Sequence, residues 1–520
     1  MTYRYNLGLA FSEIAARMGD RPALKPAHGG AISYAELDGL SNRLAAVLQE
    51  RGLRRRDVVA IVHDKSPRCY ATMLAALKMG VTYVNVDDQN PEPRLQHIFD
   101  SARPQVVVGE SLNGPIRNAA DWAKASTLEF SDASVRRDLE SAGDGDVVDS
   151  SIVTGADPAY IMYTSGSTGV PKGALMTHAN VLNFGAWTAK RFAIVPQDVL
   201  TNVNPMYFDN SVFDFYGAVL NGASLAPIAR ETLSDGAELV RQVESTGCTI
   251  WFSVPSLLIY LQTMKLVQPG RFPAVRAFVF GGEGYPKPEL RKLHAAFGSR
   301  SLLVNVYGPT ECTCICSAWD VRAEDLADDD GFVTLGQVAA NFSMLVLEEG
   351  RQVAPGSTGE LCLLGPQVGL GYVNDPERTA RAFSPNPLNA RWNEPMYRTG
   401  DLVRLGEDGR RLDFVGRRDN QVKHMGYRIE LEEIEAGLNR IEGVVQSAVL
   451  QKTTKRGHKI LVAYVASDRA MNEPEMRAAL EGFLPPYMIP QAFDIRSTLP
   501  KNANGKIDKI ALAAYDSSTA

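Results

Sequence analysis

The stretch 160–178 reads YIMYTSGSTGVPKGALMTH and joins an apolar run to a segment rich in glycine, serine and threonine. Gly166, Gly169 and Gly173 allow unusual backbone angles and close approach of a bound group. Exposed amides and hydroxyl groups in such a loop form a nest for anionic oxygens. Lys172 adds a positive charge that suits phosphate. The stretch therefore predicts a phosphate-binding loop.

Two other interpretations of this loop are weaker. The nucleotide-binding pattern G-x-x-x-x-G-K-[ST] does not fit, because Lys172 is followed by Gly173 and no glycine directly precedes it. A flexible surface loop has a similar composition. The length and regularity of this one favour phosphate binding.

Helix and strand patterns alternate around the loop, which is typical of a parallel α/β sheet. Apolar spacing predicts helices at 34–52 and at 69–80, the second ending at Gly80, and buried strands at 57–64, 81–87 and 104–110. Further strands run into glycine loops in 274–284 and 298–311. Ligands bind at the carboxyl ends of such strands, so these two loops are candidate walls of a site.

The pattern changes after residue 330. Alternating apolar residues with turn signals in 342–365 predict hairpins. A last segment predicts a helix at 429–443, strands at 444–451 and 459–467, and a helix at 472–484, which together suggest a small α+β domain. We place the boundary near Arg417–Asp419, which gives domains 1–417 and 418–520.

Composition excludes several classes of protein. The 520 residues include 54 Lys and Arg and 60 Asp and Glu, and the formal charge of −6 gives no nucleic-acid footprint. Neither a membrane span nor a signal peptide is evident, so we expect a cytoplasmic protein. Six cysteines show no disulfide framework. Cys312, Cys314 and Cys316 alternate as on a strand, but their spacing is unlike that of zinc sites, and reduced, buried thiols are favoured.

Five segments carry a resemblance to a known family. They are YTSGSTGVPKGALMTH in the loop above, NVYGPTE (305–311), YRTGDLVRL (397–405), GRRDNQVKHMGYRIELEEIE (416–435) and NANGKIDK (502–509). In this order they resemble the motifs of the adenylate-forming superfamily, which includes acyl-CoA synthetases, luciferases and adenylation domains of nonribosomal peptide synthetases. The resemblance implies an α/β fold: a large core of parallel sheets flanked by helices with a small β-barrel-like subdomain, and a small mobile α+β lid that turns about Asp419.

The resemblance also implies ATP and Mg²⁺ as cofactors. Lys506 would bridge the substrate carboxylate and the α-phosphate, Thr310 would contact that phosphate, and Glu311 would hold Mg²⁺. Tyr307 would stack on adenine and Asp401 would accept from the ribose hydroxyls. The implied nucleotide-binding residues are Thr164, Ser165, Gly166, Ser167, Thr168, Gly169, Lys172, Gly282, Glu283, Asn305, Tyr307, Gly308, Asp401 and Arg417.

The segment FDNSVFDFYGAVLNGASL (208–225) is similar to the amino-acid-activating branch, in which Asp209 would bind the substrate ammonium. A helix N-cap is the structural alternative for Asp209. The walls implied for the substrate side chain carry no second charge and suit a small or branched aliphatic amino acid. They are Asp209, Asn210, Phe213, Phe252, Val279, Gly281, Val306, Cys314 and Ile315.

The second step implied by the resemblance is attack of a thiol on the acyl-adenylate, with residues 424–428 lining the thiol tunnel and Gly426 leaving room. No carrier-protein or condensation motif is present, so we expect a stand-alone enzyme whose acceptor is the phosphopantetheine arm of a separate carrier protein. A D-alanine–carrier protein ligase is the nearest alternative. An acyl- or aryl-CoA ligase and a non-catalytic binding protein are also open, although Asp209 disfavours the former and the intact Lys506, Glu311 and Asp401 disfavour the latter.

Overall fold

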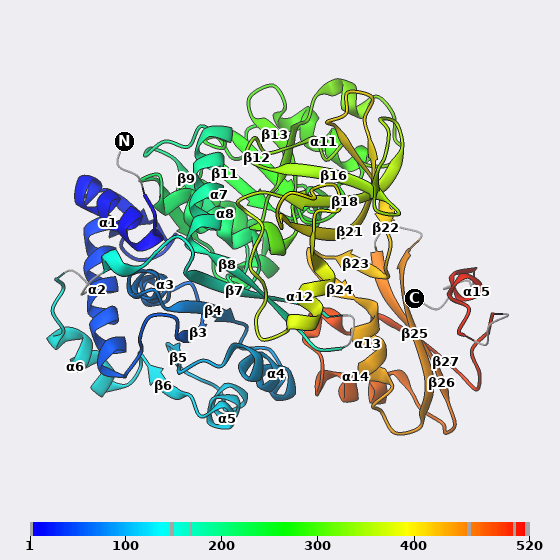
Figure 1. The fold of residues 1–520 in the computed structure, drawn as a ribbon, viewed down its shortest axis with the longest axis horizontal. Helices are drawn as coiled ribbons and strands as arrows, with labels where there is room; N and C mark the ends of the chain where they lie inside the picture. The colour runs from blue at the N-terminus through cyan, green and yellow to red at the C-terminus, as the bar shows by residue number, and fades with distance from the viewer. Residues whose placement is uncertain (1–3, 146–149, 167–168, 455–458, 503–505, 515–520) are drawn as a thin grey trace.

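The computed structural model of the chain describes residues 4–145, 150–166, 169–454, 459–502 and 506–514. Two large, mainly parallel sheets form the core, as the alternation of helix and strand patterns predicts (Figure 1). Among the described helices, none is long and apolar enough to cross a membrane.

The first sheet has seven strands in the order β19-β8-β7-β4-β3-β5-β6. Its central strands pair in parallel, and β8 closes against β7 as an antiparallel neighbour. This antiparallel pair flanks the phosphate-binding loop predicted above. The strands are β3 (Val58–Val62), β4 (Thr82–Val86), β5 (Val106–Gly109), β6 (Ser126–Glu129), β7 (Pro158–Thr164), β8 (Lys172–Thr177) and β19 (Gly371–Tyr372).

The second sheet has nine strands in the order β15-β14-β13-β12-β11-β9-β10-β1-β2. The run from β13 to β1 is parallel, so the carboxyl ends of β11, β12 and β13 lie at one edge. The strands are β1 (Pro22–Leu24), β2 (Ile32–Ser33), β9 (Val199–Asn202), β10 (Ser224–Pro227), β11 (Ile250–Ser253), β12 (Ala277–Gly281), β13 (Leu302–Tyr307), β14 (Ser317–Asp320) and β15 (Gln337–Val338).

Capping residues mark the start of one core helix and the end of another. A capping box of Ser33 and Glu36 starts α2, and Gly80, in the left-handed conformation with φ 67°, ends α3 as predicted. The core helices are α1 (Leu7–Met18), α2 (Tyr34–Glu50), α3 (Pro67–Met79), α4 (Glu92–Ala102), α5 (Gly114–Ala123), α6 (Ala133–Ser141), α7 (His178–Arg191), α8 (Asn210–Val219), α9 (Gly236–Ser245), α10 (Pro255–Thr263), α11 (Lys287–Phe297) and α12 (Pro376–Ala382).

A third, antiparallel sheet follows, in agreement with the hairpins predicted after residue 330. Its order is β17-β16-β18-β21-β20, with β22 paired to β21. The strands are β16 (Ser343–Glu348), β17 (Arg351–Gln352), β18 (Thr358–Leu364), β20 (Phe383–Pro385), β21 (Pro395–Leu405) and β22 (Leu412–Arg417).

The C-terminal part begins with a hairpin of β23 (Gln421–His424) and β24 (Tyr427–Glu430), here called the lid hairpin. It is followed by α13 (Leu431–Leu438), β25 (Val444–Thr453), β26 (Lys459–Ser467), α14 (Glu473–Glu481), β27 (Ala492–Arg496) and α15 (Lys509–Ala514). Figure 1 shows the lid hairpin between the core and the sheet of β25, β26 and β27.

One predicted element is wrong at its start. The helix expected from residue 429 begins at Leu431, because Ile429 and Glu430 pair with Val422 and Gln421 in the lid hairpin. The turn of this hairpin holds Met425 at φ 51° and Gly426 at φ 82°. The helical spacing of apolar residues is therefore overridden by strand pairing at this point.

A single hydrophobic cluster joins the two large sheets. Tyr160 of β7, Phe184 of α7, Phe213 of α8 and Val279 of β12 are all fully buried in it. The substrate residues predicted above lie at the edge of this core. The core thus fixes the strands and helices from which the site is built.

Candidate active site

The phosphate loop, defined here as residues 164–172, joins β7 to β8 at the edge of the first sheet. Thr164 and Ser165 are buried, and Gly169 has φ 79°, as a tight turn requires. Lys172 begins β8, and its Nζ lies 3.8 Å from Oε1 of Glu311. Two further residues of the predicted loop, Ser167 and Thr168, lie outside the described residues.

Six of the fourteen residues predicted to bind the nucleotide line a cavity of about 470 Å³. Tyr307 is buried at the end of β13, and its hydroxyl donates to Oδ2 of Asp401 at 2.5 Å. Asn305 donates from Nδ2 to the carbonyl of Thr334 at 2.9 Å. The structure brings together at this cavity Gly282, Glu283, Asn305, Tyr307, Asp401, Arg417 and Asp419, while Gly308 lines the adjoining space.

Arg417 connects the predicted ribose-binding residue to the predicted hinge. Its guanidinium donates to Oδ1 of Asp401 at 2.5 Å and to both carboxylate oxygens of Asp419 at 2.6 and 2.7 Å. Although burial opposes the charge, the two carboxylates raise the pKa of Arg417. Arg417 thus links Asp401 to Asp419, where we place the domain boundary. The boundary itself stays a prediction.

Asp209 directly precedes α8, and it lines the cavity at the site. Its side chain makes no capping hydrogen bond, so the N-cap alternative does not describe it. The hydroxyl of Thr310 donates to Oδ2 of Asp209 at 2.8 Å. Burial raises the pKa of Asp209 to about 6 despite this hydrogen bond. The carboxylate is therefore short of positive charge, which an ammonium group would supply.

A cavity of about 60 Å³ extends from Asp209 among the side chains predicted to hold the substrate. Asn210, Phe252, Val306, Cys314 and Ile315 line it. The other three predicted walls lie behind them. Phe213 packs edge-on against Phe252 with ring centroids 5.0 Å apart, Val279 pairs with Phe252 between β12 and β11, and Gly281 lets β12 approach Val306.

Glu311, the predicted Mg²⁺ ligand, is fully buried. Oε1 accepts from the Tyr372 hydroxyl at 2.7 Å and Oε2 from Nη1 of Arg428, in the lid hairpin, at 2.7 Å. Burial would raise the pKa of Glu311, but Arg428 and Lys172 outweigh burial and lower the pKa to about 2. Glu311 is thus a charged carboxylate beside the phosphate loop, which is the type of ligand that Mg²⁺ prefers.

A second cavity, of about 490 Å³, reaches Asp209 from beneath the lid hairpin. Of the residues 424–428 predicted to line a thiol tunnel, Met425, Gly426, Tyr427 and Arg428 line this cavity, whereas His424 does not and is buried. A Cβ on Gly426 would lie 2.6 Å from Cγ1 of Val254. Only glycine therefore leaves this wall in place.

Lys506 is exposed and lines none of these three cavities. Its backbone N–H donates to Oδ1 of Asn502. In this orientation of the C-terminal part, the lysine at the site is Lys423 of the lid hairpin, whose Nζ lies 5.4 Å from the ring centroid of Tyr307. The predicted role of Lys506 in the first step therefore requires a different orientation.

Sequence reasoning missed the charged residues through which the C-terminal part contacts the site. Lys423, Arg428 and Glu433 lie within the segment that carried the family resemblance, from which Arg417, the hinge Asp419 and the tunnel residues 424–428 were singled out, but none of these charge contacts was predicted. Their basic and acidic character in a segment predicted to line a site was the available signal. Arg94, the partner of Glu433, and Tyr372, which donates to Glu311, carried no such signal.

The cysteine trio does not lie on a strand. Thr313 and Cys314 have φ of 61° and 73°, so the chain turns between Cys312 and Cys316 before β14 begins. All six cysteines are free and buried, as expected. Cys314 packs in the core between the large sheets, whereas Cys312 and Cys316 pack in another cluster.

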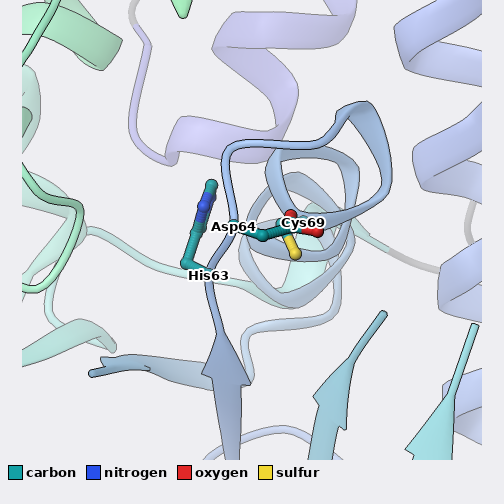
Figure 2. A group of neighbouring side chains, drawn as sticks. All are labelled: His63, Asp64 and Cys69. Atoms are coloured by element: carbon teal, nitrogen blue, oxygen red, sulfur yellow. The ribbon is translucent and has the colours of Figure 1, made fainter. Parts of the chain in front are cut away.

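One other group of potential metal ligands lies close together among the described residues. It consists of His63, Asp64 and Cys69, around the turn between β3 and α3 (Figure 2). Each has a structural partner: His63 Nδ1 accepts from the N–H of Lys65, Asp64 Oδ1 from the N–H of Ser66, and the Cys69 thiol donates to the carbonyl of Val62. We therefore interpret these three side chains as structural residues that hold the turn between β3 and α3 by hydrogen bonds.

Comparison with known proteins agrees with this geometry. The model of the AMP-binding enzyme family matches residues 11–373, and that of the AMP-binding enzyme C-terminal domain matches residues 433–506. Surfactin synthase subunit 3 of Bacillus subtilis is 34% identical over 510 residues, which are 97% of this chain and 38% of that protein. The chain thus spans less than half the length of this curated relative.

Solved structures show the same architecture. An artificially fused adenylation–PCP di-domain of a nonribosomal peptide synthetase, NpsA-ThdA from Klebsiella oxytoca, has a TM-score of 0.82 at 26% identity and covers 95% of this chain and 94% of its own. o-Succinylbenzoate CoA synthetase from Bacillus subtilis has a TM-score of 0.84 at 20% identity, with 99% of both chains covered, which shows the shared fold alone.

The nucleotide cavity, the phosphate loop and the matches over most of the chain define an adenylate-forming ligase. The chain belongs to the AMP-binding enzyme family. Within it, the chain is of the type found in the adenylation domains of nonribosomal peptide synthetases.

Proposed function

We propose that this chain joins a small aliphatic amino acid to AMP, releasing pyrophosphate, and then transfers the aminoacyl group to the phosphopantetheine thiol of a carrier protein. The observation that carries the proposal is the state of Asp209. This carboxylate has one oxygen held by Thr310, caps no helix, and has a pKa raised by burial. A substrate ammonium would supply the missing charge.

The size of the side-chain cavity supports a short side chain. A volume of about 60 Å³ holds only a few groups the size of a water molecule. The edge-to-face packing of Phe213 on Phe252 closes its apolar side. Apart from Asp209, the side chains predicted as walls for the substrate side chain are uncharged, so a charged group packed among them would be costly to bury.

The first step requires the substrate carboxylate to attack the α-phosphorus while pyrophosphate leaves. Lys172 and the amides of the described part of the phosphate loop would hold the leaving group. Glu311 would hold Mg²⁺, which supplies positive charge to the departing phosphates when it is bound. We propose that Lys506 enters this site when the lid hairpin withdraws, and that it orients the attacking carboxylate.

The second step uses the orientation described here. The cavity of about 490 Å³ connects Asp209 to the space beneath the lid hairpin, and we propose that it admits a thiol-bearing arm. A thiolate entering along the cavity that Val254 and Gly426 line would attack the acyl carbonyl, forming a thioester and releasing AMP. Lys423 lies on the nucleotide side of this path, above Tyr307.

The test is ATP–pyrophosphate exchange with a panel of L-, D- and β-amino acids and simple carboxylic acids. We expect exchange with a small aliphatic amino acid, and loss of that exchange in Asp209→Ala. Asp88→Asn, which changes an exposed carboxylate, is the control. Exchange with no amino acid in the panel would refute the proposal.

The same panel separates the nearest alternatives. Preference for D-alanine over L-alanine would identify a D-alanine–carrier protein ligase, which the small cavity also suits. Exchange with a carboxylic acid that lacks an amino group, followed by thioester formation with CoA, would instead identify an acyl-CoA ligase.

A further inference from the structure

A carboxylate from the C-terminal part occupies the anion-binding turn of the phosphate loop. Oε2 of Glu433, on α13, accepts from the N–H of Gly166 at 3.1 Å, and Oε1 is ion-paired with Arg94 of α4. The side chain of Glu433 is 1% exposed. An amide and a guanidinium around an oxyanion form the type of environment that binds phosphate. Glu433 therefore lies where a phosphate oxygen of ATP or pyrophosphate is expected.

A guanidinium group from the C-terminal part, that of Arg428, is bound to Glu311, the predicted Mg²⁺ ligand. Nη1 of Arg428 lies 2.7 Å from Oε2 of Glu311, and the Tyr372 hydroxyl satisfies Oε1. Both oxygens of this fully buried carboxylate are thus engaged. The guanidinium places positive charge where the site is suited to Mg²⁺.

Ser165 connects these two contacts. Its hydroxyl donates to the carbonyl of Arg428 at 2.7 Å and accepts from the N–H of Glu430 at 3.1 Å. Lys172 Nζ lies 3.7 Å from the carboxylate of Glu430. The described part of the phosphate loop therefore binds the lid hairpin with the same groups that we expect to bind phosphate.

We propose that Arg428 and Glu433 are positioning residues for the transfer step, which seat the lid hairpin by taking the places of Mg²⁺ and pyrophosphate. The inference rests on the proposed two-step function. Each buried charge of the site then has an opposite charge beside it in both steps, so neither step leaves Glu311 or Gly166 without a partner. The seated lid hairpin and bound magnesium pyrophosphate exclude one another, because their like charges compete for the same partners.

This exclusion orders the two steps. A ligand that binds only one orientation shifts the population toward it in proportion to its differential affinity. Magnesium pyrophosphate holds the lid hairpin off, and its departure exposes the groups onto which Arg428 and Glu433 dock. The thiol tunnel, whose wall includes Met425 to Arg428, is thus completed only after the leaving group has gone.

The exclusion is tested directly on the unmodified protein by amide hydrogen exchange. The protein is saturated with AMP and given no amino acid, so that pyrophosphate cannot re-form ATP. We expect Mg²⁺ and pyrophosphate together to speed exchange in a peptide covering β24 and the start of α13, more than either does alone. Unchanged exchange there, while binding of radiolabelled pyrophosphate is measured in the same sample, would overturn the inference.

The positioning role is tested by measuring the two steps separately in Arg428→Gln and Glu433→Gln. The second step is measured with pantetheine as the thiol, added to enzyme preloaded with the amino acid that is most active in exchange. We expect the transfer rate to fall about tenfold or more relative to the exchange rate. Arg428→Lys keeps the charge and should restore part of the transfer. Glu432→Gln changes the neighbouring carboxylate, which contacts Asn420, and should leave the ratio unchanged.

The outcomes separate this inference from the proposed function. Parent protein that shows no exchange with any amino acid would refute the proposed function. Parent protein that exchanges and transfers, with the same ratio of the two rates in both variants, would refute the role of Arg428 and Glu433 alone.

Discussion

The Thr310 hydroxyl and the Asp209 carboxylate lie 2.8 Å apart, which ties the loop after β13 to the start of α8. This contact leaves one oxygen of Asp209 for a ligand. It also joins the residue we assign to the substrate amine to the residue we assign to the α-phosphate, so that both groups are held in one frame.

The pKa of Asp209 leads to a pH dependence. Burial raises that pKa to about 6, so the carboxyl is neutral below pH 6 in the free enzyme and cannot bind an ammonium group well. We expect kcat/KM for the amino acid to fall about tenfold per pH unit below this value, while kcat falls less because the bound ammonium favours the charged form. Asp209→Asn should lose this dependence, and a parent profile that is flat down to pH 5 would contradict it.

Removing the same charge should stabilise the ligand-free protein. A carboxyl whose pKa is raised on folding destabilises the folded state once the pH is above the folded pKa. We expect Asp209→Asn to raise the free energy of unfolding at pH 7 by about 1–3 kcal/mol. Chemical unfolding at pH 7 and pH 4 checks this, since the gain should disappear at the lower pH.

Lys506→Ala should slow adenylation and spare transfer to the thiol, whereas Arg428→Gln and Glu433→Gln should slow transfer more than adenylation. Lys506 is exposed in the orientation described here, so its loss should leave transfer from a preloaded adenylate intact. ATP–pyrophosphate exchange should fall about 100-fold or more, the usual effect of removing one group that stabilises a transition state. Lys501→Ala changes another exposed lysine nearby and should behave as the parent. Exchange that is unaffected in Lys506→Ala would refute its role.

Gly426→Ala should block seating of the lid hairpin. Gly426 has φ 82°, and an added Cβ would lie 2.6 Å from Val254. We expect pantetheine transfer to fall about tenfold, because the hairpin turn must shift to relieve the contact. Gly409→Ala is the matched control, since it has φ 66° but no atom within 4 Å of the added Cβ. The double variant with Val254→Ala should recover part of the rate, and no recovery would argue against the contact.

Asp157 should contribute stability that is lost in acid. It is 1% exposed and accepts hydrogen bonds from Thr154, Arg55 and Arg56. Burial alone would raise its pKa, but these partners outweigh burial and lower the pKa to about 2. Stability from this group is therefore present above about pH 4 and is lost as the pH falls toward 2.

Chemical unfolding of Asp157→Asn checks this contribution. The variant should be less stable than the parent by about 2 kcal/mol at pH 7, with a difference that shrinks below pH 4. Asp138→Asn, at an exposed carboxylate 3.5 Å from Arg51, should differ little from the parent. An Asp157→Asn variant as stable as the parent at pH 7 would contradict the assignment.

The sequence predicted those features that depend on nearby residues. The strand at 57–64, the helix that ends at Gly80 and the glycine turn before Lys172 each follow from local spacing and backbone preference. The residues predicted to form an amino-acid pocket came from the resemblance to the amino-acid-activating branch, and six of them line one cavity: Asp209, Asn210, Phe252, Val306, Cys314 and Ile315.

Contacts between distant residues could not be predicted in the same way. Arg428 and Glu311 are 117 positions apart, and Arg94 and Glu433 are 339 positions apart. No local pattern indicates that these charges meet, since the meeting depends on the orientation of the C-terminal part. Glu430 was predicted in a helix for a different reason, because its pairing with Gln421 within the lid hairpin overrides the helical spacing of apolar residues.

The burial of all six thiols of the chain has a consequence for the proposed chemistry. An aminoacyl-adenylate reacts with thiolates, and a cysteine thiolate beside it would be acylated first. Burial raises the pKa of every cysteine here, including Cys314 in the wall of the substrate cavity. These thiols stay protonated and weakly nucleophilic. The enzyme is thereby protected from modification by its own intermediate, and the activated group is kept for an acceptor that arrives from outside.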